Sequence, residues 1–372
     1  MDKHWKQFAC TLVLASTLIP LQSESQQPTG LDPGLVAKAD AGDAASQTLI
    51  GLAYEHGRGV TQDYAQAALW YRKAAEQGDA HAQLNLGILY AKGQGVPQDY
   101  ERAAAWDRKA ADQGDAKAQF NLGLDYSLGQ GVSRDDVQAI AWYRRAAEQG
   151  NADAQFNLGV RYDKGNGVPL DLAQAASWFR KAAEQGDSNA QNEVGSCYEY
   201  GHGVPQDYAQ AAVWYRKAAG QGQAEAEEGL GSLYSRGLGV PQDYAQGATW
   251  YRRAAEQGDD EAQHNLGFLY VRGLGVRQDY VKAADWLHKA AEQGYAPSQT
   301  LLGLLFFLGH GVSQNYADAY FWLSIAAENA DWPDQEKAIK ARDLAAAKLT
   351  PEVRSKAKER AAKWIAAHQT KP

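Results

Sequence analysis

The chain has 372 residues and a formal net charge of -8, so it lacks the broad positive field that a nucleic-acid backbone requires, and nucleic acid is excluded as an expected partner. With 45% hydrophobic and 22% charged residues, the chain can bury a core and is not expected to be disordered. Its length alone would suggest two or three domains, but an internal repeat overrides that estimate and favours one elongated repeat domain.

The first 25 residues have the pattern of an export signal. Two lysines precede an apolar run from Phe8 to Leu21, and small residues follow at Ser23 and Ser25, which is the arrangement that a signal peptidase reads. The apolar run is shorter than the roughly 18 residues expected of a membrane span. We therefore predict a signal peptide over residues 1–25 and no transmembrane segment after its removal; an uncleaved anchor is the alternative.

Residues 26–41 are predicted to be a linker and a short N-terminal capping helix. Gln, Pro and Gly dominate its first part, as in a loop. The second part, LVAKADA at Leu35 to Ala41, echoes the closing segment of each later repeat. It is therefore expected to cover the open side of the first repeat.

A glycine recurs every 36 residues from Gly42 onward. The remaining copies are Gly78, Gly114, Gly150, Gly186, Gly222, Gly258 and Gly294. A fixed period of this length is the signature of a solenoid. Eight repeats are predicted to fill 42–329, as 42–77, 78–113, 114–149, 150–185, 186–221, 222–257, 258–293 and 294–329.

The second repeat shows how each copy is expected to fold. Asp79 can cap a first helix whose apolar positions return at three- and four-residue spacing. Gly93 tolerates the left-handed conformation that ends a helix, and Pro97 prevents the helix from resuming. Asp99 can then cap a second helix. Each repeat is therefore predicted to be a helix, a loop and a second helix.

Two sets of recurring residues indicate which surfaces are buried. A Leu-Gly pair returns inside most first helices, and the glycine, which costs about 1 kcal/mol there, indicates a neighbouring helix close to the backbone. A tryptophan returns in every second helix, as Trp70, Trp106, Trp142, Trp178, Trp214, Trp250, Trp286 and Trp322. One helix pair cannot cover such a surface alone, so the sequence predicts an all-α fold, a right-handed α-solenoid.

Residues 330–372 are predicted to be capping helices and a tail at the C-terminus. The eighth repeat departs from the pattern, with Asn315 in place of the capping Asp and Ala330 where a glycine was due, as terminal repeats often do. Asp334 to Lys348 is expected to form one helix, and Thr350 before Pro351 starts another. The last helix is basic, which indicates either a solvated capping face or a docking site for an anion.

Three motifs carry a family resemblance. Ala-x-Ala-Gln-x-Asn-Leu-Gly, Tyr-x-x-Gly-x-Gly-Val-Pro-Gln-Asp-Tyr and Ala-Ala-x-Trp-Tyr-Arg-Lys-Ala-Ala-Glu-Gln-Gly follow one another around Ala80 to Gly114. The pattern closely resembles the Sel-1-like repeat family, which belongs with the tetratricopeptide-like helical repeats. The resemblance implies a scaffold or adaptor protein of an envelope or secretory assembly. Together with the signal, it implies a bacterial protein that is periplasmic or secreted.

The resemblance also implies a second function. Some exported bacterial members of the family are cysteine-rich and have been linked to binding or cleaving β-lactams. An envelope hydrolase or antibiotic-binding protein is therefore the alternative. This chain lacks the cysteines of those members, since Cys197 is the only one left after signal removal and no intrachain disulfide can form.

We found no pattern of catalytic, metal-binding or cofactor-binding residues. None of the eight histidines forms a ligand pair four residues apart with a supporting acid. The Gly-x-Gly of each loop lacks the third glycine and the preceding strand of a dinucleotide site, so turn formation accounts for it better. Cys197 lies inside a first helix, where a buried structural role is expected. The chain is predicted to be no enzyme, with no cofactor and no metal.

A binding surface is predicted on the outward side of the first helices in repeats two to four. At 100° per residue these positions lie opposite the stacked side, and the resemblance implies that they line a concave face. They are His81, Leu84, Asn85, Ile88, Lys117, Phe120, Asn121, Leu124, Asp153, Phe156, Asn157 and Val160.

An apolar row of Leu84, Phe120 and Phe156 then lies beside a row of asparagines, whose amides can bond to a peptide backbone. A protein or peptide partner is predicted, of unknown identity. Two readings compete with it: these residues tie adjacent repeats together, or the array is a spacer without a specific partner.

Overall fold

The computed structural model describes residues 30–331 and 333–369, and the predicted signal peptide lies outside them. Every regular element of the described residues is a helix, and they contain no strand. They group into two compact units. The N-terminal unit comprises residues 30–190 and 202–204, and the C-terminal unit comprises residues 191–201 and 205–369. The prediction of an all-α repeat array is confirmed.

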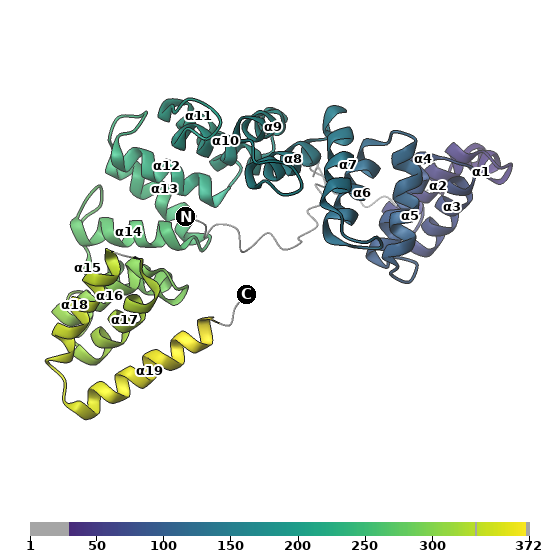
Figure 1. Ribbon diagram of the computed structural model, residues 1–372. Coiled ribbons are helices and arrows are strands. Elements are labelled where there is room, and N and C mark those ends of the chain that lie inside the picture. The colour runs from purple at the N-terminus through teal and green to yellow at the C-terminus, as the bar shows by residue number, and fades with distance from the viewer. Residues whose placement is uncertain (1–29, 332, 370–372) are drawn as a thin grey trace. The chain divides into compact units, whose positions relative to one another are not determined.

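The helices follow one another in pairs, two to each repeat (Figure 1). In the N-terminal unit they are α1 (Pro33–Asp40), α2 (Ala44–His56), α3 (Tyr64–Glu76), α4 (Ala80–Lys92), α5 (Tyr100–Asp112), α6 (Ala116–Leu128), α7 (Asp136–Glu148), α8 (Ala152–Lys164) and α9 (Leu172–Glu184). Helix α10 (Ser188–Tyr200) crosses the boundary between the units.

The C-terminal unit continues with the same pairing. Its helices are α11 (Tyr208–Ala219), α12 (Ala224–Arg236), α13 (Tyr244–Glu256), α14 (Asp260–Arg272), α15 (Tyr280–Glu292), α16 (Ala296–Leu308), α17 (Tyr316–Asn329), α18 (Asp334–Ala346) and α19 (Pro351–Gln369).

The predicted capping residues set the helix bounds. Asp79 accepts a hydrogen bond from the backbone N–H of Ala82 at 2.7 Å and starts α4. Gly93 ends that helix in the left-handed conformation, with φ at 67°. Asp99 accepts from the N–H of Arg102 at 2.9 Å and starts α5. Helix-loop-helix geometry is therefore encoded locally, by residues that satisfy the free N–H groups of each helix start.

Two glycines of the repeat are required by close packing. A Cβ atom on Gly95 would lie 2.2 Å from the carbonyl oxygen of Tyr64 in the preceding repeat. A Cβ atom on Gly123, inside α6, would lie 2.6 Å from the ring of Tyr143. The second contact is the close approach that the helical glycine predicted, because the aromatic ring of the second helix packs directly on the backbone of the first.

A buried glutamine on seven of the eight first helices joins consecutive repeats. In the second repeat, Gln83 donates through Nε2 to the carbonyl oxygen of Ala75 at 3.1 Å, which ends the previous repeat. Its Oε1 accepts from Nε2 of Gln113 at 2.8 Å, at the end of its own repeat. The same pair of bonds recurs at Gln47, Gln119, Gln155 and Gln263. We call this arrangement the glutamine clamp.

The tryptophans are covered from two sides. Trp142, Trp178, Trp214 and Trp322 are buried, and the other four are half-buried. In seven of the eight, the lysine or arginine three residues later lies over the indole ring, at 3.7 to 4.7 Å from its centroid. The ring is therefore held between the next helix and a cation from its own helix, an attraction that adds to burial.

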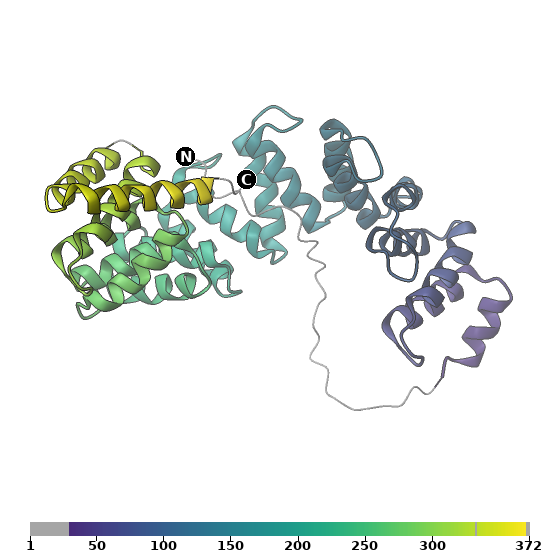
Figure 2. The same ribbon diagram turned by 90° about the horizontal axis from the view of Figure 1, so that it is seen from below.

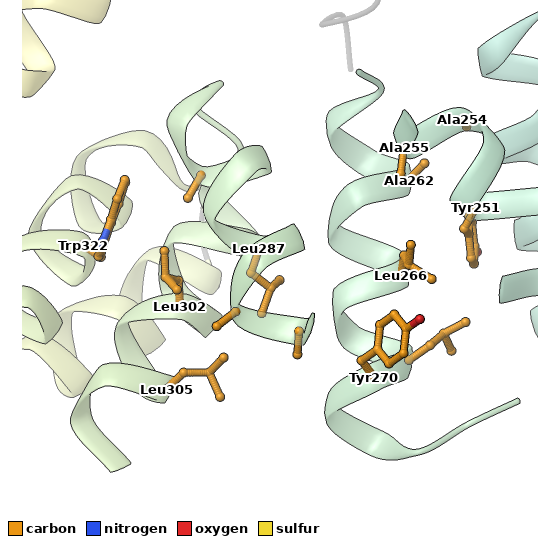
Figure 3. Close-up of a cluster of buried hydrophobic side chains, with 14 of the residues drawn as sticks. Tyr251, Ala254, Ala255, Ala262, Leu266, Tyr270, Leu287, Leu302, Leu305 and Trp322 are labelled. Carbon is orange, nitrogen blue, oxygen red and sulfur yellow. The ribbon is translucent and has the colours of Figure 1, made fainter. Parts of the chain in front are cut away.

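Apolar contacts run from one repeat into the next. In the C-terminal unit one cluster includes Leu266, Leu287 and Leu302, which lie on the consecutive helices α14, α15 and α16 (Figure 3). Each of these side chains is at most 1% exposed. The core is thus shared between neighbours, as the two ladders predicted.

The C-terminal helices close the array in two different ways. Helix α18 stands where a ninth repeat would begin and keeps part of the clamp, since Gln335 donates to the carbonyl oxygen of Ala327 at 2.9 Å. Helix α19 packs on α17 instead (Figure 2). Its Arg360 lies 2.7 Å from Asp318 and over the ring of Phe321. Two lysines of α19 pair with glutamates four residues earlier, which favours the capping-face reading of its basic residues.

One repeat carries an acid in the clamp position. Glu227 is 4% exposed and accepts from Gln257 at 2.8 Å. A carboxylate has no donor, so it cannot bond to the carbonyl oxygen of Ala219 as the glutamines do at the matching place. Burial raises the pKa of the Glu227 carboxyl above its ordinary value of 4.5, with the amide of Gln257 opposing that shift.

Replacing this acid should therefore stabilise the protein. We expect Glu227→Gln to raise the free energy of unfolding by about 1 kcal/mol at neutral pH, because it restores one donated hydrogen bond and removes a buried charge. Because the pKa of the Glu227 carboxyl is higher in the folded chain, the wild-type protein loses stability as pH rises above the pKa of this group in the unfolded chain. The stability gained through Glu227→Gln should therefore be smaller near pH 4 than at neutral pH. Urea denaturation at both pH values measures it. Gln263→Glu is the mirror control and should destabilise; a stabilising effect of that change would contradict the clamp.

Candidate functional site

The predicted surface lies entirely in the N-terminal unit, on α4, α6 and α8. His81, Lys117 and Asp153 are the second residues of the three helices and are exposed. The following predicted residues are half-buried: Asn85, Ile88, Phe120, Asn121, Leu124, Phe156, Asn157 and Val160. The structure therefore places eleven of the twelve predicted residues at least partly at the surface.

Leu84 is the exception, and its expected exposure was wrong. It is 6% exposed and packs in a cluster with Leu122 and Trp142 of the next repeat. The rings of Phe120 and Phe156 also lie near rings of their own second helices, at 5.8 Å from Tyr143 and 5.7 Å from Phe179. The apolar row is thus mainly part of the packing between helices, because the next repeat covers a side that a single helix would leave open.

The asparagines of the second row have different surroundings. Asn157 donates through Nδ2 to the carbonyl oxygen of Asp153 at 2.9 Å, within its own helix. Asn121 instead lies beside the carboxyl of Asp107 and favours the ionised form of that group. Asn121 is therefore the member of the asparagine row that lies beside a buried carboxyl group.

Asp107 stands where other repeats carry an aromatic or leucine side chain. The matching residues are Tyr71, Tyr143, Phe179, Tyr215, Tyr251, Leu287 and Leu323, all at most 5% exposed. Asp107 is 3% exposed, and its Oδ1 has no hydrogen-bond partner. This position therefore buries a polar group where other repeats bury a ring or a leucine side chain, and a Cβ atom on Gly87 of α4 would lie 2.9 Å from its Oδ1.

Asp125 on α6 takes a place that is a core leucine in four of the other seven repeats and Ala53, Arg161 or Cys197 in the remaining three. Leu89, Leu233, Leu269 and Leu305 take this place in other repeats, at most 3% exposed. Asp125 is half-buried, and its Oδ2 is covered without a hydrogen-bond partner. The hydroxyl of Tyr143, a side chain with 0% exposure, also lacks one. We call Asp107, Asn121, Asp125 and Tyr143 the polar cluster.

Burial and mutual repulsion shape the titration of this cluster. Burial raises the pKa of Asp107 well above its ordinary value, and the negative charge of Asp125 raises it further. Burial also raises the pKa of Asp125 to about 7. For Tyr143, burial raises the pKa to about 12, although the positive charge of Arg161 opposes this. The cluster therefore holds two carboxyls that take up protons far more readily than exposed ones.

The neighbouring arginines are engaged with other groups. Arg161 on α8 pairs with Asp136 at 2.8 Å and donates to the hydroxyl of Ser127. Arg108 on α5 donates to the hydroxyl of Tyr126 and lies over the ring of Trp142. In the part of the chain that the structure describes, neither carboxyl of the polar cluster forms an ion pair.

The C-terminal unit has a second group of acids, and these have partners. Glu199 accepts from the hydroxyl of Tyr215 at 2.8 Å and lies 3.7 Å from Arg236. Glu228 accepts from Nδ2 of Asn265 at 3.1 Å. Burial raises the pKa of both glutamates. Their hydrogen bonds account for them within the fold, so this group is a weaker candidate for a site than the polar cluster.

The described residues do not bring a metal-binding set together. No group of three or more His, Cys, Asp or Glu side chains among them is placed to hold a metal ion. Cys197 is 8% exposed, in agreement with the buried position expected for it.

The repeat is shared with a known protein family. The sequence profile of the Sel1 repeat matches the chain eight times, at residues 44–79, 80–115, 116–151, 152–187, 188–223, 224–259, 260–295 and 296–331. The chain therefore belongs to the Sel1 repeat family.

A solved structure agrees with this assignment. The chain is similar to a Sel1 repeat protein from Oxalobacter formigenes, with 34% identity and a TM-score of 0.62, over 86% of this chain and 94% of the other. It is also similar to c5321, a protective antigen of uropathogenic Escherichia coli strains, with 32% identity and a TM-score of 0.49, over 90% and 86% of the two chains. A search among curated proteins gave no match.

Sequence reasoning identified Asn121 but missed the other members of the polar cluster. An alignment of the eight repeats with one another shows that Asp107 and Asp125 depart from the repeat pattern. The second repeat reads Trp-Asp-Arg at Trp106 to Arg108 where others read Trp-Tyr-Arg, and the third has Asp125 in a leucine column. Asp107 is an acid in a column that is aromatic or leucine in the other repeats, and Asp125 stands in a column in which Arg161 is the other charged residue. A buried acid in such a column marks either strain or a function.

Returning these two positions to the repeat pattern should stabilise the protein. We expect Asp107→Phe and Asp125→Leu each to raise the free energy of unfolding by about 1–3 kcal/mol at pH 8, because each removes a buried carboxyl that lacks a hydrogen bond and adds buried apolar surface.

The gain should depend on pH. The raised pKa values mean that the wild-type chain loses stability as pH rises from about 4 to about 7, and Asp125→Leu should weaken this loss. Thermal unfolding followed by circular dichroism at several pH values measures it. A lower melting temperature for both variants at pH 8 would show that the carboxyls contribute to stability instead.

Proposed function

We propose that this chain is a non-enzymatic scaffold that binds a protein or peptide partner along the outward side of α4, α6 and α8, the face predicted to be concave. Sel1 repeat proteins generally act as protein-interaction scaffolds. The observation that carries the proposal is the polar cluster. A fold that can fill these columns with tyrosine and leucine retains the buried carboxyl of Asp107 and the half-buried carboxyl of Asp125 there, and Asn121 of the predicted face lies on the same helix as Asp125. Functional sites often contain residues that make the folded protein less stable than the regular pattern would.

The surface around the cluster suits a polar segment of chain. Asn121 and Asp125 are half-buried, so the cluster reaches the surface of α6 through them. Phe120 and Leu124 are half-buried beside them and offer apolar contact. A peptide in extended conformation has free N–H and C=O groups, and the amide of Asn121 can bond to either.

The place of action is proposed from the ends of the chain. Residues 1–25 act as an export signal, and the mature protein is periplasmic or secreted in a bacterium. Residues 26–41 form the linker and N-terminal cap, 42–329 the repeats and 330–372 the C-terminal cap. Among the described residues, the structure contains no helix with the length and apolar character needed to span a membrane.

A peptide library tests the proposed surface. The whole chain is used to select binders from a phage-displayed library, and the affinity of the best peptides is measured for variants. Asn121→Ala should weaken binding about tenfold, the loss of roughly one good hydrogen bond to a partner. Asn157→Ala is the matched control, because Asn157 bonds within its own helix, and should change affinity less than threefold.

The two variants should have melting temperatures close to that of the wild type. If no peptide or protein is selected, or if Asn121→Ala and Asn157→Ala bind equally well, this surface does not carry the interaction. If Asn121→Ala fails to fold, the asparagine ties repeats together, and Phe120→Leu provides the second variant on the same surface.

A further inference from the structure

The tryptophan of the eighth repeat has different neighbours from the other seven. In those seven, a lysine or arginine three residues later lies over the indole ring. Trp322 has Ile325 at that place, and the isoleucine is fully buried. The rings of His288, Phe321 and Trp364 lie 4.9 to 6.1 Å from the indole of Trp322, at interplanar angles of 69 to 76°. This indole therefore has aromatic neighbours and no cation from the next turn of its own helix.

A cavity of about 330 Å³ opens beside these rings, within the C-terminal unit. Its lining comes from α15, α16, α17 and α19. Trp322 is 5% exposed and forms an inner wall, whereas Trp364 is half-buried. One face of Trp364 stacks on His368 at 3.7 Å, so the rest of the ring borders the cavity. A volume near 300 Å³ is the lower end of the range for ligand sites, which indicates a small ligand or a single chemical group.

The charged groups that line this cavity leave it negative. Arg360 lies 2.7 Å from Asp318, and His288 lies 3.6 Å from Glu292. With the imidazole neutral, two carboxylates and one guanidinium sum to one negative charge. An anion would be repelled by both carboxylates, so the cavity favours a cation.

The guanidinium of Arg360 shows how the walls of the cavity hold a cation. It lies 3.8 Å from the centre of the Phe321 ring and pairs with Oδ1 of Asp318. The other oxygen of Asp318 accepts from Nδ2 of Asn315 at 2.5 Å. A ligand cation therefore meets aromatic rings more readily than free hydrogen-bond acceptors. A primary ammonium group needs acceptors for three N–H groups, but a quaternary ammonium group needs none and is attracted to aromatic faces.

We propose that this cavity binds a trimethylammonium group against Trp322 and Trp364, with Glu292 and Asp318 supplying the negative charge. The proposal is independent of the peptide surface, which lies in the N-terminal unit. It assigns the site to the eighth repeat because the tryptophans of the other repeats have a cation of their own. The competing reading is a packing gap between the last repeat and its capping helix.

Calorimetric titration of the full chain with small ligands tests the chemistry. Choline carries the trimethylammonium group, and 3,3-dimethyl-1-butanol has the same shape with an uncharged carbon in place of the nitrogen. Ethanolamine carries a primary ammonium group instead. Choline should bind at least about tenfold more tightly than either of the other two, a difference of about 1.4 kcal/mol. Cosedimentation with phosphatidylcholine vesicles distinguishes a lipid headgroup from a free compound as the source of the group.

Aromatic variants connect choline binding to the cavity. Trp364→Leu keeps an apolar wall without an aromatic face and should weaken choline binding at least about fivefold, whereas Trp364→Phe should retain most of the affinity. Trp250→Leu is the matched control. It removes the indole of the sixth repeat, which is also half-buried but has Arg253 over its ring, and it should leave choline binding unchanged.

Charge variants separate a cation site from an anion site. Glu292→Gln should weaken choline binding about threefold, and Glu256→Gln, at the matching exposed place one repeat earlier, should leave it unchanged. Arg360→Gln should strengthen binding, because it removes a competing cation from the lining. Melting temperatures establish that each variant is folded. If Trp364→Leu does not fold, the two glutamate variants and Arg360→Gln still test the site.

Several results would overturn the proposal. Equal affinity for choline and the uncharged alcohol would do so, as would tighter binding of ethanolamine. Weaker binding in Arg360→Gln would show that the guanidinium holds the ligand. If neither choline nor the vesicles bind, the cavity is a packing gap. Vesicle binding that Trp364→Leu abolishes, without binding of free choline, would support the site and assign the trimethylammonium group to a lipid headgroup.

Discussion

The repeat array depends on the hydrogen bonds of a buried glutamine in seven of its eight first helices. Gln83 bonds backward to Ala75 and forward to Gln113, so its amide is satisfied only when three helices are in place. A buried amide without these partners would cost a few kcal/mol. A single helix pair is therefore incomplete. The ends follow the same rule, since Gln47 bonds to α1 and Gln335 on α18 bonds back to α17.

This constraint explains why departures from the pattern are informative. Residues at surface positions differ between the repeats. A substitution at a core position, in contrast, changes the packing of a repeat against both of its neighbours. Glu227 keeps one of the two clamp bonds and remains within the structural scheme. Asp107 and Asp125 do not, because each introduces a buried oxygen without a partner. Two such substitutions on the neighbouring helices α5 and α6 are most simply understood as a site that exchanges stability for recognition.

Much of the fold could be predicted from the sequence because its signals are local and repeated. Asp79, Gly93 and Asp99 set helix starts and ends through hydrogen bonds within a few residues, so no knowledge of distant contacts was needed. The hydrogen bonds of Gln83 could not be predicted, since they join residues thirty positions apart. Leu84 was misplaced for a related reason: a helical projection shows one helix, and the residue is covered by the next repeat.

The candidate site was predicted only in part. Asn121 was identified from its position on the outward side of α6, but its partner Asp107 lies on a different helix, and the pattern of one repeat cannot show that the two meet. Column-by-column comparison of the repeats would have marked Asp107 and Asp125 as unusual. Only the packing of α5 against α6 shows that both unusual residues belong to one cluster.

A crystal structure of the full chain with a bound peptide tests the central claim most directly, which is that the outward side of α4, α6 and α8 carries the interaction. The account predicts a backbone N–H or C=O group of the peptide within about 3.2 Å of the side-chain amide of Asn121. A peptide bound on another surface, with only water beside Asn121, would contradict it.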